Sequence, residues 1–103
     1  MPSERGMNYL AKSIMQNDKD RCYICGGRAT EEHHIFHGSN RQNSEKYGLK
    51  VYLCPRCHRT SNTAIHGKDG HMMDEVLKKA AQKTFELSWG HEKFMEVIGK
   101  NYL

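Results

Sequence analysis

The chain has 103 residues, of which 37% are hydrophobic and 27% are charged, and its net charge is +4. This length fits one domain with a small core, and no apolar run approaches the ~20 residues that a membrane-spanning helix needs. The mildly basic charge permits a nucleic-acid partner without requiring one.

The start of the chain, residues 1–6, is polar and no apolar segment follows it, so we expect no signal peptide. Without an export signal we expect a reducing cytoplasmic compartment, where cysteines bind metals more often than they form disulfides. The chain divides into a leader, a cysteine- and histidine-rich core, and a helical C-terminal support that belongs to the same domain. These parts are residues 1–21, residues 22–67 and residues 68–103.

Two strands joined by a long loop are predicted within the core. Residues 29–37 are expected to form a strand anchored by Ile35 and Phe36. Residues 38–48 are rich in glycine, serine and asparagine and predict a polar loop. In residues 49–53 the apolar side chains alternate, which is typical of a strand with one buried face. We therefore expect a β-hairpin.

Three helices are predicted after the hairpin. The first spans residues 55–66, with Pro55 in its first turn, where proline is tolerated, and Gly67 as its stop. The second spans about residues 71–87 and the third about residues 91–98. The apolar stripe of the second helix consists of Met73, Val76, Leu77, Ala80, Ala81, Thr84 and Phe85. Both late helices are expected to supply apolar mass that the cysteine- and histidine-rich part lacks.

The four cysteines form two Cys-x-x-Cys pairs, Cys22 with Cys25 and Cys54 with Cys57. Such a turn points both sulfurs at one point about 2.3 Å from a zinc ion, so two turns together make a closed tetrahedral site. A redox dithiol would use a single pair in a βαβ setting, and two disulfides would need an oxidising compartment. We predict a structural zinc ion whose binding contributes to the free energy of folding.

The histidines predict a second, open metal site. His33 and His34 lie on the first predicted strand, and His58 directly follows the last cysteine, so zinc would draw them together. His58, Asn62 and His66 are four residues apart in turn, which places them on one face of the predicted helix. Metal-capable side chains on one helical face, opposite a histidine pair on a strand, favour a bound cation.

Some of these side chains have ordinary alternatives. Strict alternation would send His33 and His34 to opposite faces of the strand, so both serve one site only if the strand ends or kinks there. His37 could be a ligand, a phosphate contact or a solvated side chain. His66 could instead interact with the dipole at the end of its helix.

The order of these motifs resembles that of the zinc-stapled HNH (His-Me finger) endonucleases. The resemblance rests on the first cysteine pair, on His33-His34-Ile35 in a strand, and on Cys54-Pro-Arg-Cys57-His58 opening a helix. It covers about residues 22–66, and the later residues resemble small phage and prophage proteins of this family more loosely. The family implies an α+β fold with a zinc-stapled ββα-metal core around one catalytic cation, here followed by additional C-terminal helices.

The resemblance implies a metal-dependent DNA endonuclease that hydrolyses phosphodiester bonds. His34 matches the general base that activates water, and a histidine with an ordinary pKa of about 6.5 can accept a proton from water at neutral pH. His33 and His58 match ligands of the catalytic divalent cation, and His66 is a further candidate ligand. Arg59, beside His58, is the best candidate for a phosphate clamp.

Two positions depart from the family pattern. Leu49 stands where the family has its middle asparagine, so the orienting role of that residue is open. The candidates for it are Asn62, Asn40 and Asn43. His33 stands where the family usually has aspartate, which removes a negative ligand. A site built from His33, His58 and His66 is therefore predicted to prefer manganese, nickel or cobalt over magnesium.

Basic residues near the proposed site could neutralise DNA phosphates and give salt-dependent binding with little sequence selectivity. They are Arg28, Arg41, Lys46, Lys50, Arg56 and Arg59. DNA structure, or a phage or recombination protein as partner, could direct the enzyme, and the oligomeric state stays open. The alternative function is a non-catalytic, zinc-stabilised nucleic-acid-binding or adaptor module. The cysteines fit both functions equally, whereas the clustered histidines favour the enzyme.

Overall fold

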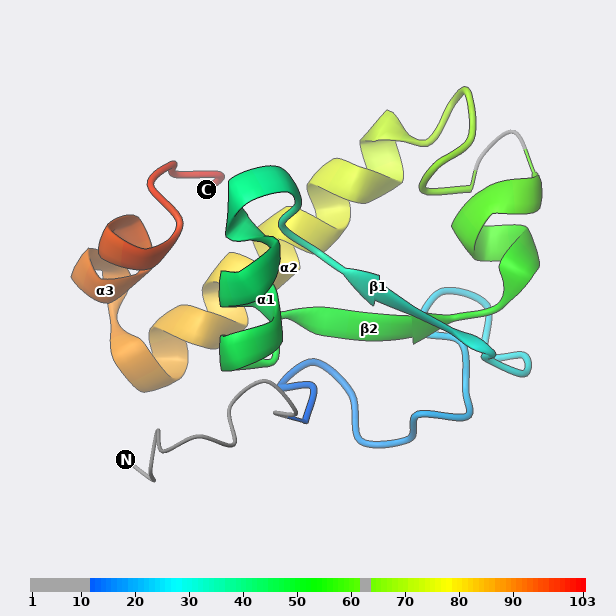
Figure 1. Ribbon diagram of the computed structural model, residues 1–103, viewed down its shortest axis with the longest axis horizontal. Helices are drawn as coiled ribbons and strands as arrows, with labels where there is room; N and C mark the ends of the chain where they lie inside the picture. The colour runs from blue at the N-terminus through cyan, green and yellow to red at the C-terminus, as the bar shows by residue number, and fades with distance from the viewer. Residues whose placement is uncertain (1–11, 62–63) are drawn as a thin grey trace.

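The computed structural model describes residues 12–61 and 64–103. Its strands, β1 (Glu31–His34) and β2 (Lys50–Leu53), pair antiparallel, with His33 opposite Val51 and His34 opposite Lys50. Figure 1 shows the two strands side by side. The other elements are the 3₁₀ turn η2 (Gly38–Asn40), α1 (Arg41–Tyr47), the π-helical turn η3 (Arg56–Thr60), α2 (His71–Trp89) and α3 (His91–Val97). The predicted α+β class is confirmed.

Helix α1 lies where the residue pattern predicts a polar loop, so that prediction is wrong. This segment has good helix propensity because it contains arginine, glutamine, glutamate and lysine. Its serine and asparagine residues are typical of loops, so the residue pattern does not indicate the helix. The buried Ser44 hydroxyl donates to Phe36 O at 2.9 Å and accepts from Phe36 N at 3.0 Å, which fastens α1 to the end of the first strand segment. Gly48 ends the helix with φ +72°, and a Cβ there would lie 2.2 Å from Lys12 O.

The predicted helix over residues 55–66 is also wrong, because the helical turn η3 ends at Thr60. Ser61 is extended, with φ −99° and ψ 162°. The hydroxyls of Thr60 and Ser61 bond to the carbonyls of Pro55 and Arg56 at 3.4 and 3.0 Å, and such side-chain bonds compete with helix continuation. Asn62 lies outside the described residues.

One hydrophobic core joins the hairpin to the later helices. Phe36, Phe85 and Phe94 are fully buried, and their rings meet edge to face at 5.5 to 5.7 Å. The predicted stripe of α2 is confirmed at Leu77, Ala81 and Phe85, whereas Val76 is 56% exposed and does not belong to it. No helix in the described part of the chain has the length and apolar character to span a membrane.

Residues 12–21 run along β2 on the side away from β1. The Ser13 hydroxyl donates to Lys50 O at 2.5 Å, and Tyr52 N donates to Gln16 Oε1 at 2.7 Å. These contacts cover backbone groups that an edge strand would otherwise expose. The earlier part of the predicted leader, residues 1–11, lies outside the described residues.

Candidate metal centres

The four cysteines lie together, with their sulfurs all within 4.8 Å of one another. Cys25 Sγ and Cys54 Sγ are 3.7 Å apart, close to the roughly 3.8 Å between two sulfurs that each lie about 2.3 Å from one tetrahedral zinc. Gly26, at φ +80°, turns the chain so that its N–H donates to Cys22 O at 2.9 Å. The prediction that these four residues form a group able to hold zinc is confirmed.

Two thiols of this group, those of Cys22 and Cys57, have pKa values that are shifted in opposite directions. Burial raises the pKa of Cys22, but the backbone N–H groups of Cys25, Cys54 and Ile24 outweigh it and lower that pKa to about 6. Burial, together with hydrogen bonds to the neighbouring thiols, raises the pKa of Cys57 above its usual range. Cys22 and Cys57 therefore resist ionising together, and a divalent cation would stabilise both as thiolates.

Three imidazoles gather beside the hairpin, those of the buried His33 and His58 and of the exposed His66. One nitrogen each of His33, His58 and His66 lies within 4.8 Å of the other two. The His58 and His66 ring centroids are 4.7 Å apart, and His33 lies 5.2 Å from each. The predicted helical stripe is not the cause, because His66 follows the end of η3. Instead, His66 N donates to His58 O at 2.9 Å, so a chain reversal places the rings together.

Glu31 orients His58. His58 Nδ1 lies 2.6 Å from Glu31 Oε1, and Arg59 Nε donates to the same oxygen at 3.3 Å. The hydrogen bond from His58, aided by the one from Arg59, holds the pKa of Glu31 below its ordinary value. With Nδ1 donating to a carboxylate, Nε2 is the nitrogen left to bind a cation. Glu31 was missed from the sequence, although alternation along β1 puts it on the same face as His33.

His33 is held neutral by its surroundings. It is 2% exposed, and burial, followed by repulsion from His58, His37 and His66, lowers its pKa to about 3. Burial and the same kind of repulsion lower the pKa of His66 as well. A neutral imidazole is the form that binds metal ions, so these histidines are available as ligands at neutral pH.

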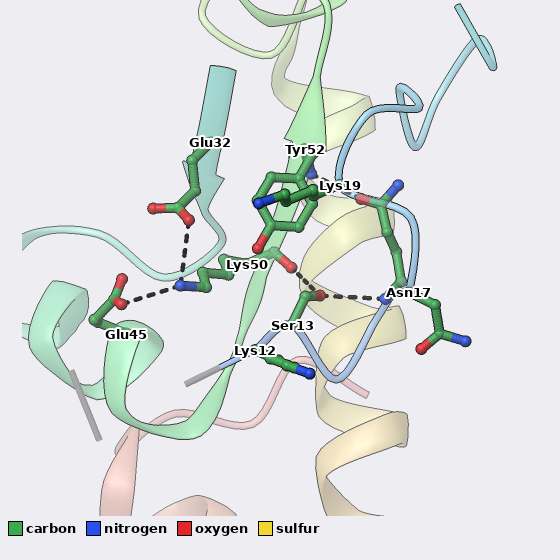
Figure 2. A pocket seen from close by; sticks show the side chains of 9 residues that line it. Lys12, Ser13, Asn17, Lys19, Glu32, Glu45, Lys50 and Tyr52 are labelled. Atoms are coloured by element: carbon green, nitrogen blue, oxygen red, sulfur yellow. Dashed lines mark hydrogen bonds and ion pairs between the residues drawn. The ribbon is translucent and has the colours of Figure 1, made fainter. Parts of the chain in front are cut away.

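His34 points to the opposite face of the hairpin, as strand alternation requires. Its Nε2 lies 2.6 Å from Glu45 Oε1. Lys50 Nζ lies 3.0 Å from Glu45 and 3.2 Å from Glu32, and Figure 2 shows the two carboxylates converging on this ammonium group. Glu32, Glu45 and Lys50 line a cavity of about 770 Å³ on this face. Lys50 is buried and paired with both, so it is not placed for the predicted phosphate contact.

Residues from both faces of the hairpin line a shallow pocket of about 250 Å³. Its lining residues are Glu32, His33, His34, His37, Arg41, His58, Arg59 and His66. Arg41 is exposed and the Arg59 side chain is 58% exposed, so both guanidinium groups reach solvent beside the histidines. Although His33 and His34 diverge, both therefore border one open pocket.

The asparagine candidates lie elsewhere. Asn40 Nδ2 donates to Ile98 O at 3.0 Å and Asn43 Nδ2 donates to Val97 O at 3.1 Å, so both tie the segment between the strands to the end of α3. Leu49, at the position of the family's middle asparagine, is fully buried in the core. The remaining candidate, Asn62, is outside the described residues.

Comparison of the chain with protein-family models, with curated proteins and with solved structures finds no match. Two adjacent residues connect the two candidate metal centres, since Cys57 belongs to the cysteine group and His58 to the three-imidazole cluster.

Proposed function

We propose that the protein is a metal-dependent DNA endonuclease with a zinc-stapled ββα-metal core and a His34 general base. One observation carries the proposal: three metal-capable imidazoles and a fourth, carboxylate-paired histidine border one open pocket that also bears two arginines. A protein that only binds nucleic acid has no need for this grouping. The ions we propose are zinc at the cysteines and a divalent cation at His33, His58 and His66.

His34 has a suitable arrangement for accepting a proton from water. The Glu45 carboxylate accepts a hydrogen bond from His34 Nε2, so the ring proton resides on Nε2. His34 Nδ1 is then the nitrogen that can act as base. The hydrogen bonds from His34 and Lys50 outweigh the effect of burial and lower the pKa of Glu45, so Glu45 stays ionised as their acceptor. This pairing also stabilises the imidazolium that forms when His34 takes up the proton.

The cation site and the two arginines have separate roles, at the scissile phosphate and at the flanking phosphates. A bound divalent cation supplies positive charge for the scissile phosphate and the leaving oxygen. Glu31 holds His58 in the tautomer that leaves Nε2 free, and burial keeps His33 neutral. Arg41 and Arg59 offer guanidinium groups beside these residues for the flanking phosphates. Such contacts bind the DNA backbone without reading its sequence.

The test is nicking of supercoiled plasmid by wild type and by His34→Ala, each with added manganese or magnesium. We expect His34→Ala to cut at least about 100-fold more slowly, because general-base catalysis contributes roughly 10²–10⁴-fold. His71→Ala is the matched control, since His71 is an exposed histidine at the start of α2, outside the pocket. It should cut like wild type.

Zinc content and circular dichroism of all three proteins establish that they are folded. Equal cutting by His34→Ala and wild type would contradict the role of His34. If wild type never nicks DNA with any of the cations but still retards it in a gel, the alternative function, a non-catalytic nucleic-acid-binding module, replaces the proposal.

A further inference from the structure

We propose that His33, His37 and Asp74 form a second divalent-cation site, which adjoins the three-imidazole cluster and differs from it in chemistry. The residues come from β1, from the link to η2 and from the first turn of α2. One ligand atom of each lies within 4.8 Å of the other two. Two imidazoles with one carboxylate make a harder ligand set than three imidazoles, and such a set suits Mn²⁺.

Two atoms of this set are buried without a partner. Among the described residues, the buried side-chain nitrogen and oxygen atoms that lack a hydrogen bond are His33 Nε2 and Asp74 Oδ1. Buried polar atoms are rarely left unpaired, and an unpaired one calls for a water or an ion. A nitrogen and a carboxylate oxygen left unpaired within one small group are two atoms that a single bound cation would satisfy.

Lys78 directs the carboxylate of Asp74. Its Nζ lies 2.9 Å from Asp74 Oδ2, so one oxygen is occupied and Oδ1 remains for the histidines. Asp74 Oδ1 lies 3.6 Å from His37 Nε2, which is too long for a hydrogen bond. This separation fits two ligand atoms that each lie about 2.1 Å from one ion.

Asp74 also changes the charge around the pocket. The three-imidazole cluster is neutral when its histidines are neutral, whereas Asp74 adds a negative charge that offsets the charge of a cation. Asp74 lies on α2, outside residues 22–67, so the site would join the hairpin to the helix that packs beneath it. Because His33 belongs to both groups, the two sites are coupled through one side chain.

Mn²⁺ binding by the full-length, zinc-loaded protein without DNA, followed by electron paramagnetic resonance, tests the site. We expect Asp74→Asn to weaken Mn²⁺ binding at least about tenfold. Removing a residue that only hydrogen-bonds a metal ligand already costs about tenfold in affinity, and removing a ligand itself should cost no less. His37→Gln, a change at a half-exposed side chain, should weaken it as well. His66→Gln, which disrupts the three-imidazole cluster, should still bind Mn²⁺ through the proposed site.

Glu75→Gln is the matched control, because it removes the same charge from the next, exposed residue of α2. Unchanged Mn²⁺ binding in Asp74→Asn would overturn the proposal and would leave a water as the partner of the two unpaired atoms. Equal losses in Asp74→Asn and Glu75→Gln would overturn it too, since general charge would then be the cause. Circular dichroism and zinc content exclude unfolding as the reason for a loss.

The proposal does not depend on nuclease activity. Mn²⁺ binding that follows Asp74 in a protein that never nicks plasmid would reject the endonuclease and keep the cation site. Nicking that depends on His34, together with Mn²⁺ binding that ignores Asp74, would do the reverse.

Discussion

His58 Nδ1 lies 2.6 Å from Glu31 Oε1, a contact that spans the hairpin and the turn after it. The His58 side chain is 5% exposed and that of Glu31 is 29% exposed, so water competes little at the imidazole. A carboxylate in this position sets both the orientation and the tautomer of a metal-binding histidine. Glu31 is therefore expected to tune the affinity of the three-imidazole cluster without touching the ion.

Glu31→Gln should weaken Ni²⁺ or Co²⁺ binding by about 10- to 100-fold without releasing the zinc proposed at the cysteines. The amide can still accept from Nδ1, but it lacks the charge that makes the imidazole more basic. Isothermal titration of the zinc-loaded protein measures the affinity. Glu92→Gln is the control, because it removes the same charge at an exposed position of α3, outside the pocket. Equal affinities of Glu31→Gln and wild type would show that Glu31 is no more than a surface ion-pair partner.

Cys54→Ser should lose the zinc and the cooperative unfolding transition together. Metal binding at a structural site contributes on the order of 10 kcal/mol of folding free energy, more than a core of this size can replace. Metal analysis and denaturant titration followed by circular dichroism measure both properties. Ser88→Ala, at an exposed position, is the control and should keep both the zinc and the unfolding transition. A folded, zinc-free Cys54→Ser protein would show that the zinc is dispensable.

The pKa of His33 predicts how stability changes in mild acid. Because its pKa is lowered to about 3 in the folded protein, the unfolded chain takes up the proton first as the pH falls below about 6.5. The stabilisation is full above that pH and declines by up to about 1.4 kcal/mol per pH unit below it. Urea unfolding of the zinc-loaded protein between about pH 7.5 and 5.5 measures this slope.

His33→Leu removes one titrating group and should reduce the slope, leaving the part that comes from the lowered pKa of His66. Protonation of the cysteines affects both proteins alike. Zinc content is measured at each pH, so that metal release is not mistaken for this effect. Identical slopes for the two proteins would mean that His33 is not held neutral by folding.

Gly70 sets how close the segment after η3 comes to α2. Its φ of −84° is open to any residue, but a Cβ would lie 1.9 Å from Ala64 O and 2.5 Å from Ile65 O. Gly70→Ala should therefore displace the chain that carries His66 and cost about 1–3 kcal/mol. It should also weaken Ni²⁺ binding at the three-imidazole cluster. Lys68→Ala, an exposed change in the same segment, should alter neither urea stability nor metal affinity.

The imidazole-rich cluster predicts a metal preference. Nitrogen ligands bind nickel, cobalt and manganese better than magnesium, which favours carboxylates, carbonyls and water. Plasmid nicking should therefore be severalfold faster with manganese, nickel or cobalt than with magnesium at equal concentration. Cutting that is fastest in magnesium, with the other ions only inhibiting, would contradict this prediction.

Local patterns predicted much of this chain. The cysteine spacing, the alternation in β2 and the stripe at Leu77, Ala81 and Phe85 each depend on neighbours along the chain, and these features were found. The sequence does not predict helix α1, because serine, asparagine and glycine in this segment are typical of loops, although Gly48 ends the helix.

The contacts that shape the site are long-range and could not be read from spacing. Glu31, Glu45 and Asp74 reach histidines in other elements, and their positions depend on how the hairpin, α1 and α2 pack. The proximity of His58 and His66 was expected for a wrong reason, because a chain reversal replaces the helical register. Sequence spacing thus indicated the group of histidines but not the carboxylates that orient them.

Backbone hydrogen bonds connect the three-imidazole cluster to the cysteine group, which implies an order of assembly. Ile65 N donates to Cys57 O and His66 N donates to His58 O, both at 2.9 Å, so the segment that carries His66 rests on the turn that the cysteines hold. If the cysteine group binds zinc as proposed, a newly made chain has to acquire the ion before its three-imidazole cluster can assemble. Chains without zinc would then stay unfolded and be degraded, so the amount of folded protein would follow the zinc supply.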